Sequence, residues 1–151
     1  MSANIPPVVS EKNQYWIPRH RYYELKHFCL QYPVWKKAYE SLSALSGRPY
    51  DLAAVRKSGI SDPTAKCAES MAFYSTRMDM LKSAARETDG LFGEYILHGV
   101  TEGLNYDCLE ARFGVPCCRA DYYRLYRKFF WILDKKRGLE PILKLVRITQ
   151  D

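Results

Sequence analysis

The chain has 151 residues, a net charge of +6 and a pI of about 9.1, and 47% of its residues are apolar and 26% charged. This length suits one domain with its own hydrophobic core, and the composition excludes a fibrous or intrinsically disordered class. No apolar run approaches the roughly 20 residues of a transmembrane helix. The first residues, MSANIPPVVS, lack the basic and then apolar pattern of a signal peptide, so we expect a cytoplasmic protein with no membrane partner.

We expect residues 1–14 to form a loose arm that is followed by a helix. Apolar residues recur at helical spacing in this helix, as Tyr22, Leu25 and Phe28 do, up to Pro33. The residue before a proline is disfavoured in a helix, so this helix should end there.

A second helix is expected from Pro33 to Gly47, because proline is favoured in the first turn of a helix and glycine just after the last. The stretch 46–62 contains two glycines and a proline, which predicts a connector with one short helix at about 51–57. Residues 15–60 would thus make an N-terminal helical segment.

A long helix is expected over 63–88, because Ser61 or Asp62 can cap it and Pro63 then stands in its first turn. Its apolar residues step four and three places apart, which is typical of a helix that packs lengthwise against another. We call this row of residues the seam and treat it as a candidate homodimer interface. The seam consists of Cys67, Met71, Tyr74, Met78, Leu81 and Ala85. A further short helix is expected at about 91–101.

The stretch from Tyr106 to Trp131 predicts two helices that are joined by a tight turn at Gly114. Glycine suits such a turn because it adopts the left-handed backbone conformation without strain. This is the pattern of the DNA-binding helix-turn-helix motif, of about 20 residues. The residues expected to hold the motif together are Leu109, Phe113, Val115, Ala120 and Tyr123.

The second helix of this motif, expected over about 117–137, separates apolar from charged residues. Tyr123, Tyr126, Phe130 and Leu133 would form its apolar stripe. Between residues 119 and 137 seven basic residues oppose two acidic ones, so the balance is +5. Arginine and lysine can pair with DNA phosphates, and residues near the helix N-terminus can reach base edges. The alternative is that cations near the end of the helix only favour the helix dipole and keep the surface soluble.

Most of the chain resembles a family of short proteins from phages and prophages of Gram-positive bacteria. The similar stretches are YWIPRHRYYELKHFCLQYPVWKKAY, SDPTAKCAE and the segment from YILHGVTEG to DKKRG. The nearest functional analogues are late-gene transcription activators and the helix-turn-helix of sigma-factor region 4. The resemblance implies a transcription regulator that binds double-stranded DNA in the cytoplasm of a bacterial host. It implies DNA contacts by Arg119, Asp121, Tyr122, Arg124, Arg127 and Lys128, to which the basic end of the helix adds Lys135 and Lys136.

The N-terminal segment interleaves aromatic and basic side chains, which suits a protein interface, a nucleic-acid surface or the edge of a core. The rival function is therefore a phage protein-binding module that inhibits or redirects a host protein, such as RNA polymerase or a defence nuclease. Its candidate interface residues are Trp16, Arg19, Arg21, Tyr22, Tyr23 and Lys26.

We expect no metal, no cofactor and no enzymatic activity. His20, His27 and Cys29 do not have the spacing of a closed zinc site, and no fourth ligand is apparent. The neighbouring cysteines Cys117 and Cys118 lack a catalytic Cys–His signature. The five cysteines are an odd number and should remain thiols.

The expected fold is a small all-α domain with a C-terminal helix-turn-helix. The long helix and the helix-turn-helix would occupy 61–138, and residues 139–151 would form a short apolar C-terminal tail, either helix or strand.

Overall fold

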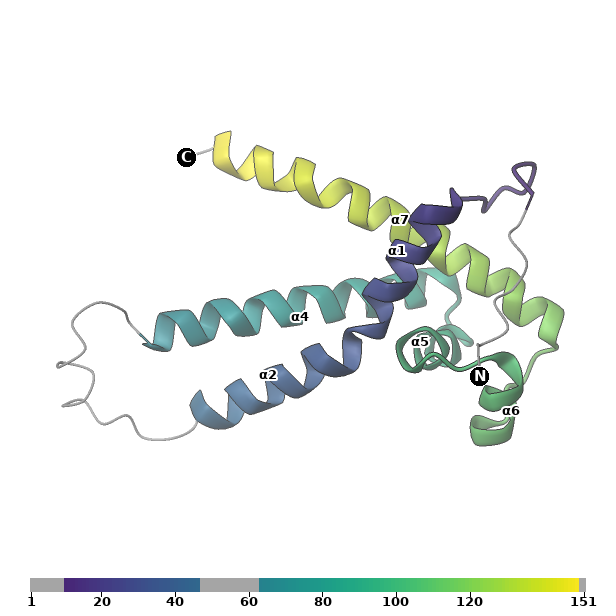
Figure 1. The fold of residues 1–151 in the computed structure, drawn as a ribbon, viewed down its shortest axis with the longest axis horizontal. Helices are drawn as coiled ribbons and strands as arrows, with labels where there is room; N and C mark the ends of the chain where they lie inside the picture. The colour runs from purple at the N-terminus through teal and green to yellow at the C-terminus, as the bar shows by residue number, and fades with distance from the viewer. Residues whose placement is uncertain (1–9, 47–62, 150–151) are drawn as a thin grey trace. The chain divides into compact units, whose positions relative to one another are not determined.

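The computed structural model describes residues 10–149 except 47–62, and over these residues all regular secondary structure is helical (Figure 1). The all-α prediction is confirmed. The predicted short helix at 51–57 and most of the predicted arm lie outside the described residues. In chain order the helices are α1 (Arg19–Leu30), α2 (Tyr32–Ser46), α4 (Pro63–Thr88), α5 (Gly93–Glu102), α6 (Tyr106–Phe113) and α7 (Arg119–Thr149). None of the described helices combines the length and the apolar character of a membrane span.

The chain divides into two compact units, one of Met1–Gln31 with Met80–Asp151 and one of Tyr32–Asp79. In the second unit, α2 runs antiparallel to the first part of α4 (Figure 1). The Cys67 thiol donates to the Leu42 carbonyl at 3.7 Å and so joins the two helices near the end of α2.

The predicted bounds of α4 are confirmed, and its seam is the more buried side of the helix. Met78, Leu81 and Ala85 are buried, whereas the earlier seam residues are half-buried. The buried half of the seam is therefore covered within the chain and is not free to pair with a second copy.

Helix α5 is central to the first unit and packs against α1, α6 and α7. Two glycines allow close approaches of α5, Gly93 to the end of α4 and Gly99 to α7. A Cβ on Gly93 would lie 2.6 Å from the Ala85 carbonyl oxygen, and a Cβ on Gly99 would lie 2.2 Å from the Tyr122 hydroxyl. Helix α5 thus approaches its neighbours at distances that a larger residue would not tolerate.

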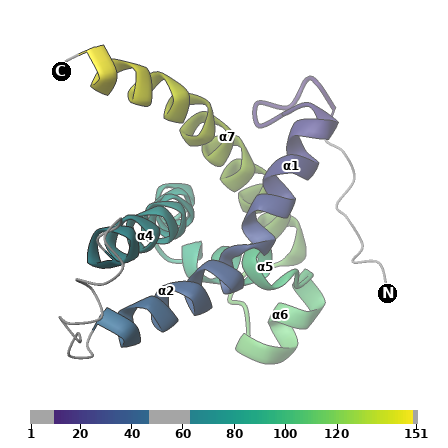
Figure 2. The same ribbon diagram turned by 60° about the vertical axis from the view of Figure 1, so that its left-hand side comes forward.

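Helix α1 crosses α7 and is joined to it by polar as well as apolar contacts (Figure 2). The hydroxyls of Tyr22 and Tyr126 lie 2.7 Å apart in a hydrogen bond, and Arg21 Nε donates to Asp134 Oδ1 at 2.5 Å. Burial raises the pKa of both tyrosines above the ordinary value, so both remain protonated. The hydrogen bond between the two hydroxyls therefore does not depend on pH near neutrality.

The predicted end of the last helix is wrong. Helix α7 begins at Arg119 and continues past residue 137 to Thr149, so residues 139–149 are helical and extend α7. A glycine inside a helix costs only about 1 kcal/mol relative to alanine, which a long helix tolerates. Gly138 is therefore not a sufficient stop signal by itself.

Candidate nucleic-acid interface

The turn between α6 and α7 has the local structure expected from its residues. The Asn105 side chain caps α6 by accepting a hydrogen bond from the Cys108 N–H at 2.9 Å. At the other end Gly114 adopts a left-handed conformation with φ of 65°, and its N–H donates to the Glu110 carbonyl at 3.0 Å. The predicted turn at Gly114 is confirmed.

Polar contacts hold α6 against the turn and the first turns of α7. The Tyr106 hydroxyl donates to the Cys117 carbonyl at 2.6 Å, and the Tyr106 N–H donates to the Tyr123 hydroxyl at 3.3 Å. Arg119 forms an ion pair with Asp107, and its guanidinium lies 5.6 Å from the centre of the Tyr106 ring. Helix α6 is thus attached to α7 by side chains from both of its first two residues.

The buried contacts of this segment only partly follow the prediction. Leu109 and Val115 are buried as expected. Ala120 is exposed, however, and Phe113 is 42% exposed and stacks on His98 of α5 with ring centres 4.7 Å apart. Helix α5 therefore supplies part of the packing that the sequence pattern assigned to α7.

Tyr122 does not belong to the exposed surface, and its predicted contact with DNA is wrong. Its side chain is 1% exposed and its hydroxyl lies against Gly99 of α5. Burial raises the pKa of Tyr122. The ring is part of the core because α5 covers this side of α7.

The buried face of α7 is wider than the predicted stripe. Tyr126, Phe130 and Leu133 are buried as expected, whereas Tyr123 is half-buried. A second row of residues, spaced three and four places apart, is also buried and was missed: Tyr122, Leu125, Phe129 and Ile132. Two rows are buried because α1 and α5 both pack on α7. The same helical spacing was visible in the sequence.

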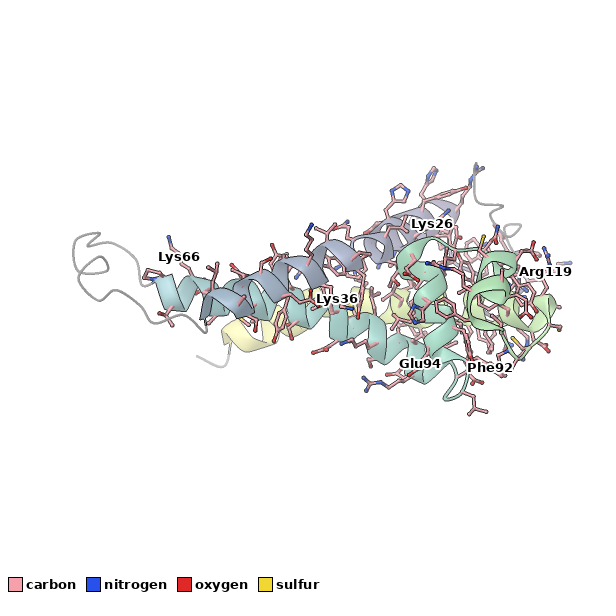
Figure 3. The ribbon with its side chains drawn as sticks, turned by 90° about the horizontal axis from the view of Figure 1, so that it is seen from below. Lys26, Lys36, Lys66, Phe92, Glu94 and Arg119 are labelled. Carbon is pink, nitrogen blue, oxygen red and sulfur yellow. The ribbon has the colours of Figure 1, made fainter. Side chains whose placement is uncertain are left out.

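The opposite face of the first turns of α7 is charged and exposed. The side chains of Arg119, Asp121 and Arg124 are 57%, 58% and 59% exposed. Figure 3 shows Arg119 at the N-terminal end of α7, with its side chain directed outward. Arg127 and Lys128, in the following turn, are half-buried. We call these five residues the α7 charged face.

Lys135 and Lys136 are not part of the α7 charged face. Lys135 Nζ lies 3.3 Å from the centre of the Trp131 ring, and Lys136 donates to Glu87 Oε1 at 2.6 Å. At 1.5 Å per residue both lie about 24 Å or more along the helix from Arg119. Lys135 thus packs on an aromatic ring of its own helix, and Lys136 joins α7 to the end of α4.

Acidic residues balance part of the positive charge of α7. Asp89 Oδ1 accepts hydrogen bonds from the Leu91 and Phe92 N–H groups at 2.8 and 2.9 Å. These bonds lower the pKa of Asp89, and the nearby charges of Lys128 and Arg124 lower it further. The hydrogen bond from Lys136 likewise lowers the pKa of Glu87.

We expect the Asp89 and Glu87 carboxylates to make the stability of the fold sensitive to acid. Their ordinary pKa values are 3.8 for Asp89 and 4.5 for Glu87, and both are lowered in the folded chain. A lowered pKa stabilises the fold above the unfolded value, and this contribution is lost as the pH falls through the folded value. The midpoint temperature of thermal unfolding should therefore fall less steeply between about pH 5 and pH 3 in Asp89→Asn/Glu87→Gln than in the unmodified chain. Circular-dichroism melts would measure the midpoint temperature at each pH. Equal pH dependence in the two proteins would contradict the lowered pKa values of Asp89 and Glu87.

The Tyr122 hydroxyl gives a second stability prediction, because it has no hydrogen-bond partner among the described residues. Tyr122→Phe removes a buried polar group without opening a cavity, so the free energy of unfolding should stay unchanged or rise by up to about 1 kcal/mol. Tyr126→Phe is the matched control, since it removes a hydroxyl that is bonded to Tyr22 and should cost about 1 kcal/mol. Urea denaturation compares the two. A larger loss for Tyr122→Phe would mean that its hydroxyl is bonded.

The N-terminal residues predicted at a partner interface are partly engaged within the first unit. Arg21 and Tyr22 bond to α7, as described above. Trp16, Tyr23 and Lys26 are half-buried, and only Arg19 of the six is exposed. The Arg19 guanidinium lies 5.7 Å from the centre of the Tyr23 ring. This segment is therefore largely an edge of the core.

All five cysteines are free thiols. Burial raises the pKa of Cys29 and Cys117, which disfavours their reactive thiolate forms. Among the described residues, no three His, Cys, Asp or Glu side chains gather closely enough to hold a metal ion.

No protein-family model, curated protein or solved structure matches this chain. Its described residues form an all-helical structure in which a short helix, a glycine turn and a long helix present an exposed charged face.

Proposed function

We propose that this chain is a phage-encoded transcription regulator that binds double-stranded DNA through a helix-turn-helix formed by α6, the Gly114 turn and α7. The observation that carries the proposal is the α7 charged face, which lies opposite a buried face on the same turns of the helix. A recognition helix needs this division, because one side must pack on the protein while its N-terminal residues reach the base edges.

The ion pairs on this face are compatible with DNA binding. Arg119 pairs with Asp107 and Arg124 lies 3.9 Å from Asp121, and all four side chains are more than half exposed. Ion pairs between exposed side chains contribute about 0–1 kcal/mol, so a phosphate can replace the acidic partner at little cost. The basic residues of the face can then serve as phosphate contacts.

A salt titration tests this function. The purified chain would be titrated against a fluorescent duplex of about 30 base pairs at about 50 and 200 mM salt. The α7 charged face has four basic residues, Arg119, Arg124, Arg127 and Lys128. If each contacts one phosphate, counterion release lowers the affinity by about 10²-fold between the two salt concentrations. Anisotropy that shows no binding at the lower salt, or binding that ignores salt, would contradict the proposal.

The rival function is the protein-binding module that acts on a host RNA polymerase or a defence nuclease. It has the weaker support, because Arg21 and Tyr22 of its candidate interface bond to α7 within the chain. A chain that binds no DNA but forms a stoichiometric, nuclease-resistant complex with purified host RNA polymerase would favour it.

A further inference from the structure

Two oppositely charged side chains lie one turn apart on the α7 charged face. Asp121 is 58% exposed and Arg124 is 59% exposed, and the distance from Arg124 Nη2 to Asp121 Oδ1 is 3.9 Å. This distance exceeds that of a hydrogen bond, so the guanidinium keeps its donors and Oδ1 keeps its lone pairs for other partners. An acceptor and a set of donors thus lie side by side, two and five residues after Arg119, the first residue of α7.

We propose that Asp121 and Arg124 determine sequence specificity by contacting two adjacent G·C base pairs, Asp121 on a cytosine and Arg124 on a guanine. This inference rests on the proposed DNA-binding function.

The chemistry of the major groove selects these bases. An ionised carboxylate only accepts hydrogen bonds, and cytosine presents the N4 amino group there as a donor. Adenine also presents a donor, but its N7 acceptor beside that donor repels a carboxylate. A guanidinium matches the O6 and N7 acceptors of guanine with two parallel hydrogen bonds. The two residues are separated by about 4.5 Å along the helix axis, comparable to the roughly 3.4 Å between stacked base pairs.

The other basic residues of the face suit phosphates better than bases. Arg119 is paired with Asp107 of α6, and Lys128 is half-buried with Asp89 nearby. Phosphate contacts position a protein on the duplex and carry no sequence information.

Asp121 also has a role in helix stability, which the test must separate from base contact. Its Oδ2 accepts from the Cys118 thiol at 3.3 Å, and a carboxylate in the first turn favours the helix dipole. Asparagine at this position keeps an acceptor oxygen but presents one donor and one acceptor, which match N7 and N6 of adenine.

The experiment is selection of binding sites from a randomised duplex library with the full chain and with Asp121→Asn. The unmodified chain should select adjacent G·C pairs. Asp121→Asn should change the selected base from cytosine to adenine at one position, with a change of about tenfold or more in relative affinity for the two duplexes. The neighbouring guanine and the salt dependence should not change. Glu69→Gln, at an exposed position of α4 in the other unit, removes the same charge and should select the original site.

Each outcome decides the inference. An unchanged site for Asp121→Asn, accompanied only by a lower melting temperature, would overturn it and leave Asp121 with the helix-start role. Salt-sensitive binding without any base preference would overturn it while sustaining the proposed function. No binding at about 50 mM salt would overturn both.

Discussion

Gly93→Ala should lower the free energy of unfolding by about 3 kcal/mol, the upper end of the range for an added methyl group in a packed core. The new Cβ would lie 2.6 Å from the Ala85 carbonyl oxygen and 3.0 Å from its carbon. These are backbone atoms of α4, so the clash can be relieved only if the end of α4 moves away from α5. Urea denaturation followed by circular dichroism would measure the loss.

Gly90→Ala is the matched control, because a Cβ at that glycine would meet no heavy atom within 4 Å. Its effect should be within about 0.5 kcal/mol of zero, as for most surface substitutions. Equal stabilities for the two variants would show that α4 and α5 do not approach as closely as described.

The second glycine of α5 allows a coupled version of the same test. Gly99→Ala would place its Cβ 2.2 Å from the Tyr122 hydroxyl. Because the clashing atom is a side-chain oxygen, the loss in Gly99→Ala should be partly recovered in the double variant Gly99→Ala/Tyr122→Phe. A coupling energy of about 1 kcal/mol or more is expected for residues in direct contact. Additive losses would contradict the contact.

Arg124→Glu/Lys128→Glu should reduce affinity for duplex DNA by about 10²-fold or more at about 50 mM salt. Two attractive contacts with the duplex become repulsive, and because Lys128 contacts a phosphate, the slope of log affinity against log salt should become shallower by about 1. Fluorescence anisotropy at several salt concentrations measures both quantities. An affinity equal to that of the unmodified chain would remove α7 from the interface.

The control for this pair must change net charge by the same amount. Lys36→Glu/Lys66→Glu does so at two exposed positions of the other unit, which are labelled in Figure 3. This control should retain most of the affinity if binding depends on the α7 charged face and not on total charge. In Arg124→Glu/Lys128→Glu the two new glutamates would lie close to Asp89. The far-ultraviolet circular-dichroism spectrum of this variant must therefore show that the helices persist.

Arg124→Gln/Lys128→Gln removes the same two positive charges without adding repulsion, and it should lose less affinity for the same reason.

Residue types and their spacing were enough to predict several local features of this fold. Pro63 predicted the start of α4 and Gly114 predicted the end of α6, because a proline or a left-handed glycine acts within a single helical turn. The spacing of apolar residues likewise predicted the burial of Leu25 and Phe28. The surplus of positive charge on α7 was also apparent from residues alone.

Which side chains of α7 are available to a partner depends on the helices that pack around it. Tyr122 is buried because α5 brings Gly99 against it, and Arg21 is engaged because α1 places it beside Asp134, 113 residues away in the chain. Helical spacing identifies the residues that share a face of a helix. How many of its faces are buried depends on how many other helices pack against it. The sequence therefore predicted one buried row on α7, and the packing of both α1 and α5 buried a second.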